Sequence, residues 1–164
     1  MKKLIILLVF IPFMAFADNV SKASINYVDL SVDSFSVDGW GASFDTAMND
    51  KVIWQLDWFK LSGDGGDADF SVVSGAYGFG SLAEGSAFVG FARFDSDLAD
   101  SAETELEVGY ARIGGEGPDF SVGIINSDDD LSFRGEVHTP SGISLGILTD
   151  GDVDLINIGY HVKF

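Results

Sequence analysis

Residues 155–164 read LINIGYHVKF, and this stretch contains the pattern that decides the fold. Large apolar side chains occupy every second position from Ile156 to Phe164, and the residues between them are small or polar. Successive side chains of a β-strand point to opposite faces, so this period of two predicts a strand with one apolar face. Such a strand needs protein or lipid against that face.

The same alternation recurs upstream. It is regular in residues 40–45, 52–59, 105–110, 120–125 and 131–138, and less regular in 23–33, 69–79, 86–94 and 143–149. Clusters of Gly, Asp and Ser separate these runs, and no run after residue 17 has the period of an amphipathic helix. We therefore predict about ten strands. In 86–94 two sets of residues compete for the outer face, and we expect Arg93 to point inward.

The N-terminus has the pattern of a secretory signal peptide. Lys2 and Lys3 precede an apolar run over 4–16, and residues 15–17 read AFA, the small-x-small pattern of a cleavage site. The run is shorter than the ~20 apolar residues that a spanning helix needs. We predict a signal peptide over 1–17 and one mature domain over 18–164.

Composition limits the possible partners and the source of stability. The formal net charge is −17, which argues against a nucleic-acid partner because phosphates bind Lys and Arg. The chain has no cysteine, so an exported form is stable without disulfides. Hydrophobic residues nevertheless make up 46% of the chain. Acidic and apolar groups must therefore be segregated. We expect no cofactor.

The connections between the expected strands alternate in chemistry. Every second connection is acidic, and those between them hold only Asp50, Glu84, Glu116 and Asp119 as acids. In an up-and-down sheet alternate connections lie at opposite ends. Most of the connecting acid then gathers at one end, and both termini lie at the other. The acidic connections are 33–38, 62–69, 95–103, 126–130 and 149–154.

These observations together predict an all-β fold, namely a closed antiparallel up-and-down transmembrane β-barrel of about ten strands, with eight as the alternative. The expected strands have about 8–12 residues, whereas a tilted strand needs ~9–11 to cross a bilayer. Closing the last strand on the first leaves no unpaired edge.

The last strand resembles that of small outer-membrane β-barrel proteins of Gram-negative bacteria. Gly159, Tyr160, Val162 and Phe164 match the aromatic-terminated strand that the barrel-insertion machinery reads in that group. The resemblance implies an outer-membrane location with periplasmic termini. It also implies contact with membrane lipid and lipopolysaccharide.

The barrel hypothesis assigns two sets of side chains. We expect aromatic girdles at the two lipid–water interfaces and a polar lumen of charged side chains that pair or stay hydrated. The girdle residues are Trp40, Trp54, Trp58, Phe70, Tyr110 and Phe120. The lumen residues are Asp29, Asp57, Glu105, Glu107, Arg134, Glu136, His161 and Lys163.

Few residues suggest catalysis. The only histidines are His138 and His161. Ser132, Glu136 and His138 share one face of one strand, and such neighbours do not build a catalytic triad. We therefore predict no enzymatic activity.

The acidic connections suggest a weak divalent-cation site. Their carboxylates do not fit an EF-hand loop. We favour a solvated acidic rim and predict no dedicated metal site, with weak cation binding as the alternative. The residues concerned are Asp95, Asp97, Asp150, Asp152 and Asp154.

The predicted function is that of a non-enzymatic outer-membrane surface protein with a role in envelope structure or surface interaction. The first alternative is a narrow channel for small solutes. The second is a soluble periplasmic lipocalin-like barrel, in which the apolar side chains would face inward. The sequence leaves the oligomeric state open.

Overall fold

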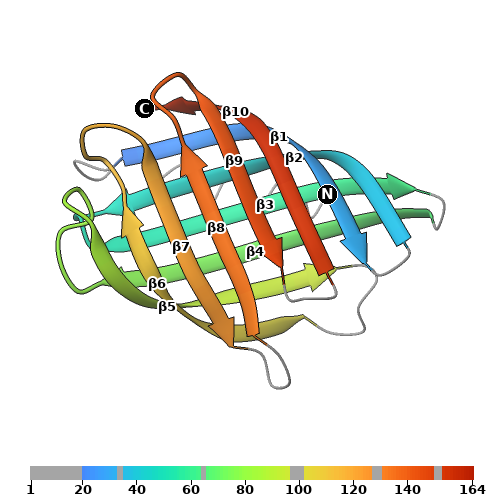
Figure 1. The fold of residues 1–164 in the computed structure, drawn as a ribbon, viewed down its shortest axis with the longest axis horizontal. Helices are drawn as coiled ribbons and strands as arrows, with labels where there is room; N and C mark the ends of the chain where they lie inside the picture. Colours follow the sequence, from blue (N-terminus) through green and yellow to red (C-terminus); the bar gives the residue numbers. More distant parts are fainter. Residues whose placement is uncertain (1–19, 33–34, 64–65, 97–101, 127–130, 150–152) are drawn as a thin grey trace, which may run out of the picture.

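A computed structural model describes residues 20–32, 35–63, 66–96, 102–126, 131–149 and 153–164. These residues form a closed barrel of ten antiparallel strands, in which each strand pairs with its neighbours in the sequence (Figure 1). The predicted architecture and the count of ten are confirmed. The predicted signal peptide lies outside the described residues. The strands are β1 (Val20–Val32), β2 (Phe35–Met48), β3 (Val52–Gly63), β4 (Gly66–Gly78), β5 (Ser86–Ser96), β6 (Glu103–Arg112), β7 (Asp119–Asn126), β8 (Leu131–His138), β9 (Ile143–Thr149) and β10 (Val153–Lys163).

The barrel closes between β1 and β10. The two strands pair in register from Lys22–Lys163 to Val32–Val153. The backbone N–H of Phe164 donates to the Ser21 carbonyl at 2.9 Å, and the N–H of Ser21 donates to the Phe164 carbonyl at 3.2 Å. The alternating stretch at 155–164 thus completes the hydrogen bonding of the first strand, which would otherwise be an edge.

The barrel has two different ends. The connections 49–51, 79–85, 113–118 and 139–142 lie at one end, which we call the turn end. The strand ends on either side of the other five connections lie at the opposite end, which we call the acidic end, because these strand ends and the sequence between them carry most of the acidic residues. Strands β7–β10 cross obliquely over β1–β4 in Figure 1, as tilted strands of a closed barrel do.

The strands extend further toward the acidic end than the sequence predicted. Asp38 lies in β2 and pairs in register with Asp29, and Asp67 lies in β4 and pairs with Ser62. Asp38 and Asp67 were expected in connections. The prediction was wrong because backbone pairing tolerates an acidic side chain that points outward into solvent. The barrel wall therefore continues beyond its apolar part.

At the turn end, one turn is fixed against another. Asn49 and Asp50 have φ values of 53° and 55°, the left-handed conformation that a two-residue hairpin turn requires. The Asp50 carboxylate accepts a hydrogen bond from the Ala83 N–H at 2.8 Å, and its carbonyl accepts one from the Leu82 N–H. A hydrogen bond from the Ser81 side chain is the main cause that holds the pKa of Asp50 below its usual value. These contacts position Leu82, which is fully buried.

Two inward-facing glycines allow aromatic rings to lie flat against the barrel wall. Phe59 pairs in register with Gly41 and covers it, and Phe88 pairs with Gly109 in the same way. A Cβ atom at Gly41 would overlap the Phe59 ring and the carbonyl oxygen of Trp58. Glycine is therefore required at these positions by close approach.

We expect Gly41→Val to lower the free energy of unfolding by about 1–3 kcal/mol, since the Phe59 ring must leave its position. Ala42→Val is the matched control, because Ala42 is exposed on the outer face beside it. The measurement is urea unfolding of the refolded protein in detergent micelles. Equal stability of the Gly41→Val variant and the control would contradict this packing.

Candidate functional site

The outer surface of the barrel is apolar. Among the described residues, twenty-four large hydrophobic side chains are exposed, including Phe79 at 67% and Ile25 at 66%. On β10 the exposed side chains Ile156, Ile158 and Tyr160 alternate with the inward-facing residues between them. A water-soluble monomer rarely exposes a contiguous apolar patch of this extent. A lipocalin-like barrel would have the opposite arrangement.

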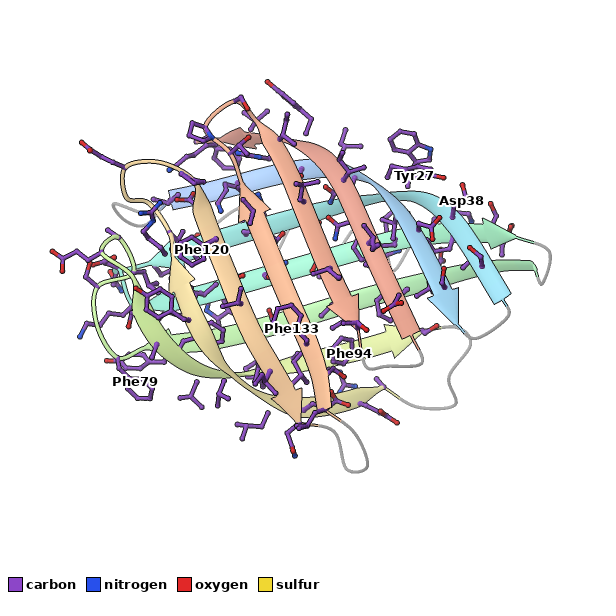
Figure 2. The ribbon with its side chains drawn as sticks, in the orientation of Figure 1. Tyr27, Asp38, Phe79, Phe94, Phe120 and Phe133 are labelled. Atoms are coloured by element: carbon purple, nitrogen blue, oxygen red, sulfur yellow. The ribbon has the colours of Figure 1, made fainter. Side chains whose placement is uncertain are left out.

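Aromatic side chains gather toward both ends of this surface. Toward the acidic end, Tyr27 and Trp40 meet edge to face with ring centroids 5.4 Å apart. Toward the turn end, Tyr110 stacks on Phe120 at 6.1 Å. Figure 2 shows Tyr27 at one end of the barrel and Phe79 and Phe120 at the other. Trp54 and Trp58 are also exposed on the outer face.

Phe70 does not belong to this outer set. It pairs in register with the buried Phe59 and stacks on it at 6.2 Å, inside the barrel. Its place in the predicted girdle is wrong, because β4 alternates irregularly near its acidic end and the sequence does not show which face is apolar. Phe94 stacks on the other side of Phe70 at 6.3 Å.

Charged side chains on the outer face lie toward the acidic end, beyond the apolar surface. Asp29 is exposed there, and the Tyr27 hydroxyl donates to the neighbouring Asp38 carboxylate at 2.9 Å. Asp29 was predicted in the lumen; that prediction is wrong because Val28 occupies the inner face. Arg93 was also expected inside, but it is exposed and donates to Thr104 at 3.1 Å. The small Ala92 takes the inner position instead.

Apolar side chains fill the interior near the acidic end. We call this group the upper cluster: it contains the buried Val28, Val37, Phe59, Leu61 and Leu155. Leu30, Phe70 and Leu148 pack against it. A second group, the lower cluster, fills the interior near the turn end. It contains Ala47, Leu82, Phe88, Ala111 and Ile113.

A polar layer lies between the two clusters, and Arg134 is at its centre. Its guanidinium lies 3.4 Å from an Asp57 carboxylate oxygen and 3.8 Å from a Glu107 oxygen, and it donates to Ser74 at 3.2 Å. Gln55 donates to Asp57 and to Glu136, both at 3.0 Å. These pairs join β3, β6 and β8 across the lumen.

The polar layer continues toward the turn end. The buried Lys22 ammonium lies 3.3 Å from Asp119, which also meets Lys163 at 3.6 Å. The His138 imidazole lies between Asp45 and Glu136, with its Nε2 atom 3.4 Å and 3.2 Å from their oxygens.

An amide network extends the polar layer toward β1, β2 and β9. Asn26 donates to Ser43 at 2.7 Å and to Ser24 at 3.1 Å, and it accepts from Ser144 at 3.1 Å. The buried polar side chains of this part of the lumen therefore have partners on other strands.

The structure places the other predicted lumen residues on the inner face. Asp57, Glu107, Arg134 and His161 are buried and Glu136 is nearly so. Glu105 is half-buried on the same face of β6 as Glu107. Lys163 is paired with Asp119 at the turn end. The lumen residues that sequence reasoning missed are Lys22, Asn26, Leu82 and Asp119. The alternation in β1 could have identified the first two.

The lumen is filled. Within the described residues, its polar layer contains two small cavities, of about 30 Å³ and 20 Å³. Each holds about one water molecule. A larger hollow of about 480 Å³ opens at the turn end, lined by His138, His161 and the connection 139–142. The arrangement supports a closed barrel with a recess at one end.

The residues considered for catalysis and for cation binding lie in separate parts of the barrel. The contacts of His138 with ionisable groups are with Asp45 and Glu136, and no hydrogen bond joins it to Ser132 among the described residues. Of the acids considered for cation binding, Asp95 and Asp154 are exposed on β5 and β10. Asp97, Asp150 and Asp152 lie outside the described residues.

The chain is similar to several solved structures, all at low sequence identity. No family model matches the chain, and no curated protein matches it. Neisserial surface protein A is similar in structure at 14% identity and a TM-score of 0.38, over 90% of this chain and 98% of that one. The N-terminal barrel domain of Pseudomonas aeruginosa OprF is similar at 12% identity and a TM-score of 0.40, over 86% of this chain and 97% of that one. The Yersinia pestis protein Ail is similar at 12% identity and a TM-score of 0.33, over 88% of this chain and 97% of that one.

Likeness at this level carries no argument about function, so the function has to be inferred from this chain's own surface and interior. Within the residues that the structure describes, no helix is long and apolar enough to cross a membrane.

We expect Arg134→Met to lower the free energy of unfolding by about 3–5 kcal/mol, because it leaves the buried Asp57 and Glu107 carboxylates without their cation. Arg93→Met is the control, since Arg93 is exposed, and it should change stability by less than about 0.5 kcal/mol. Urea unfolding in micelles measures both. Similar small effects of the two substitutions would contradict the pairing inside the lumen.

Proposed function

We propose that this protein resides in the outer membrane of a Gram-negative bacterium as a closed, non-enzymatic surface barrel. The observation that carries the proposal is the apolar outer face. Ile156, Ile158, Val108 and Ile124 are each about half exposed, on strands whose inner faces hold charged or polar groups. In a bilayer this arrangement puts apolar side chains in hydrocarbon and satisfies the backbone within the sheet.

The acidic end is proposed to face the outside of the cell. In an up-and-down barrel with ten strands, the first strand begins and the last strand ends at the same end, here the turn end. That end then faces the periplasm. The acidic strand ends and connections are suited to bridging by divalent cations to the phosphates of lipopolysaccharide. The last strand, with Tyr160 and Phe164, is the proposed signal for the insertion machinery.

A role in envelope structure or surface interaction is supported better than transport. The upper cluster, the polar layer and the lower cluster follow one another along the lumen. Solutes would have to displace Phe59 and Leu61 at one level and Leu82 at another, and all three are buried. Barrels with few strands have lumens that side chains can fill, which supports a non-conducting barrel.

We expect the refolded protein to insert into planar lipid bilayers without discrete conductance steps, because packed side chains occupy the lumen. Insertion is checked by a gel on which the folded barrel shifts in mobility only after boiling. A general porin serves as the positive control. Regular steps from protein of verified insertion would support the narrow channel, and a chain that stays soluble without detergent and does not insert would exclude the membrane location.

A further inference from the structure

Three metal-ligating side chains come together in the lumen. Asp45 on β2 and Glu136 and His138 on β8 place one donor atom each within 4.8 Å of the others. They come from opposite walls of the barrel, so the group exists only when the barrel is closed. All three are buried or nearly so.

The spacing of these donors suits a metal ion. The His138 Nε2 atom is 3.4 Å from an Asp45 oxygen and 3.2 Å from a Glu136 oxygen. A tetrahedral Zn²⁺ ion with bonds of ~2.0–2.1 Å separates its ligand atoms by about 3.3 Å. A small displacement toward a common ion is therefore sufficient, and a water molecule can take the fourth position.

The charge of the polar layer calls for a cation. Asp45, Asp57, Glu107, Asp119 and Glu136 provide five carboxylates. The cations that pair with carboxylates of the layer are Lys22, Arg134 and Lys163. With neutral imidazoles, two negative charges remain. Lys22 directs its ammonium to Asp119, and Arg134 directs its guanidinium to Asp57 and Glu107. The excess therefore falls at Asp45 and Glu136, and buried charge needs compensation.

An unpaired atom and space occur at the same place. In the described part of the chain, the Asp45 Oδ1 atom is buried without a hydrogen-bond partner. A cavity of about 20 Å³ is lined by all three ligand residues. It holds an ion-sized or water-sized sphere. His138 also lines the hollow of about 480 Å³ at the turn end, so the site lies beside this recess.

We propose that Asp45, Glu136 and His138 form a binding site for one divalent transition-metal ion, of which Zn²⁺ is the probe of choice. One imidazole with two carboxylates favours such an ion over Mg²⁺ or Ca²⁺, which take oxygen ligands. The ion cross-links β2 to β8 through the lumen and stabilises the closed barrel. The site is distinct from the exposed acids of the acidic end, and it does not depend on the proposed membrane location.

The test is Zn²⁺ titration by calorimetry of the refolded mature chain in micelles, in millimolar Mg²⁺ to occupy the exposed carboxylates. We expect one tight site per chain. His138→Gln and Glu136→Gln should each weaken binding at least about 100-fold, because each removes a ligand of the ion. His161→Gln is the matched control, because the His161 ring lies 5.0 Å from that of His138 and outside the three-ligand group. The affinity of this variant for Zn²⁺ should stay within about threefold of that of the unaltered protein.

Folding of each variant is checked by heat-modifiable gel mobility. A second measurement, on the unaltered protein, uses Co²⁺, whose visible absorption should show a four- or five-coordinate site that Zn²⁺ displaces. The proposal would be overturned if the unaltered protein bound no Zn²⁺ in the presence of Mg²⁺. It would also be overturned if His138→Gln and His161→Gln weakened Zn²⁺ binding equally. Absence of the Co²⁺ bands would overturn it too.

Discussion

The structure depends on the requirement that every backbone hydrogen bond of the sheet is made within the sheet. Pairing of β1 with β10, from Lys22–Lys163 onward, removes the last two edges. Closure in turn divides the side chains into two sets, since alternate residues can only point outward or inward. The apolar outer face and the charged interior are two consequences of one register, and a shift of one residue would exchange them.

The narrow lumen determines what the interior contains. Ten strands leave room for packed side chains, and two cavities in the polar layer are of water size. Apolar clusters lie on both sides of the polar layer. In that layer Arg134 and Lys22 each need carboxylate partners, and the partners come from strands on other walls. These cross-lumen pairs, rather than a conventional hydrophobic core, connect the two sides of the barrel. The group around His138 extends the same principle to a site that a metal ion can complete.

Sequence reasoning succeeded where one strand carried a clear period of two. β10, β3 and β2 alternate clearly over 156–164, 52–58 and 40–45, and the structure orients Ile156, Trp58 and Ser43 as this alternation predicts. It failed where both faces were mixed. Arg93 and Phe70 lie on strands in which aromatic residues occur on both faces, so local pattern could not choose the register. Asp29 was misplaced because an acidic residue was taken to be a lumen residue, although it extends the wall into solvent.

Contacts across the lumen could not be predicted from the local sequence pattern of any one strand. Asp45 and His138 are far apart in sequence and meet only because β2 and β8 lie on opposite walls. Likewise Leu82 lies in the connection 79–85, and its burial depends on hydrogen bonds between two turns.

The most direct test of the account uses spin labels along β10, introduced as single cysteines into a chain that has none. In lipid vesicles, labels at Ile156, Ile158 and Tyr160 should collide often with dissolved oxygen and rarely with a water-soluble nickel complex. Labels at Asn157 and His161 should be shielded from both. High nickel accessibility at the three outer positions would place them in water and contradict the membrane barrel.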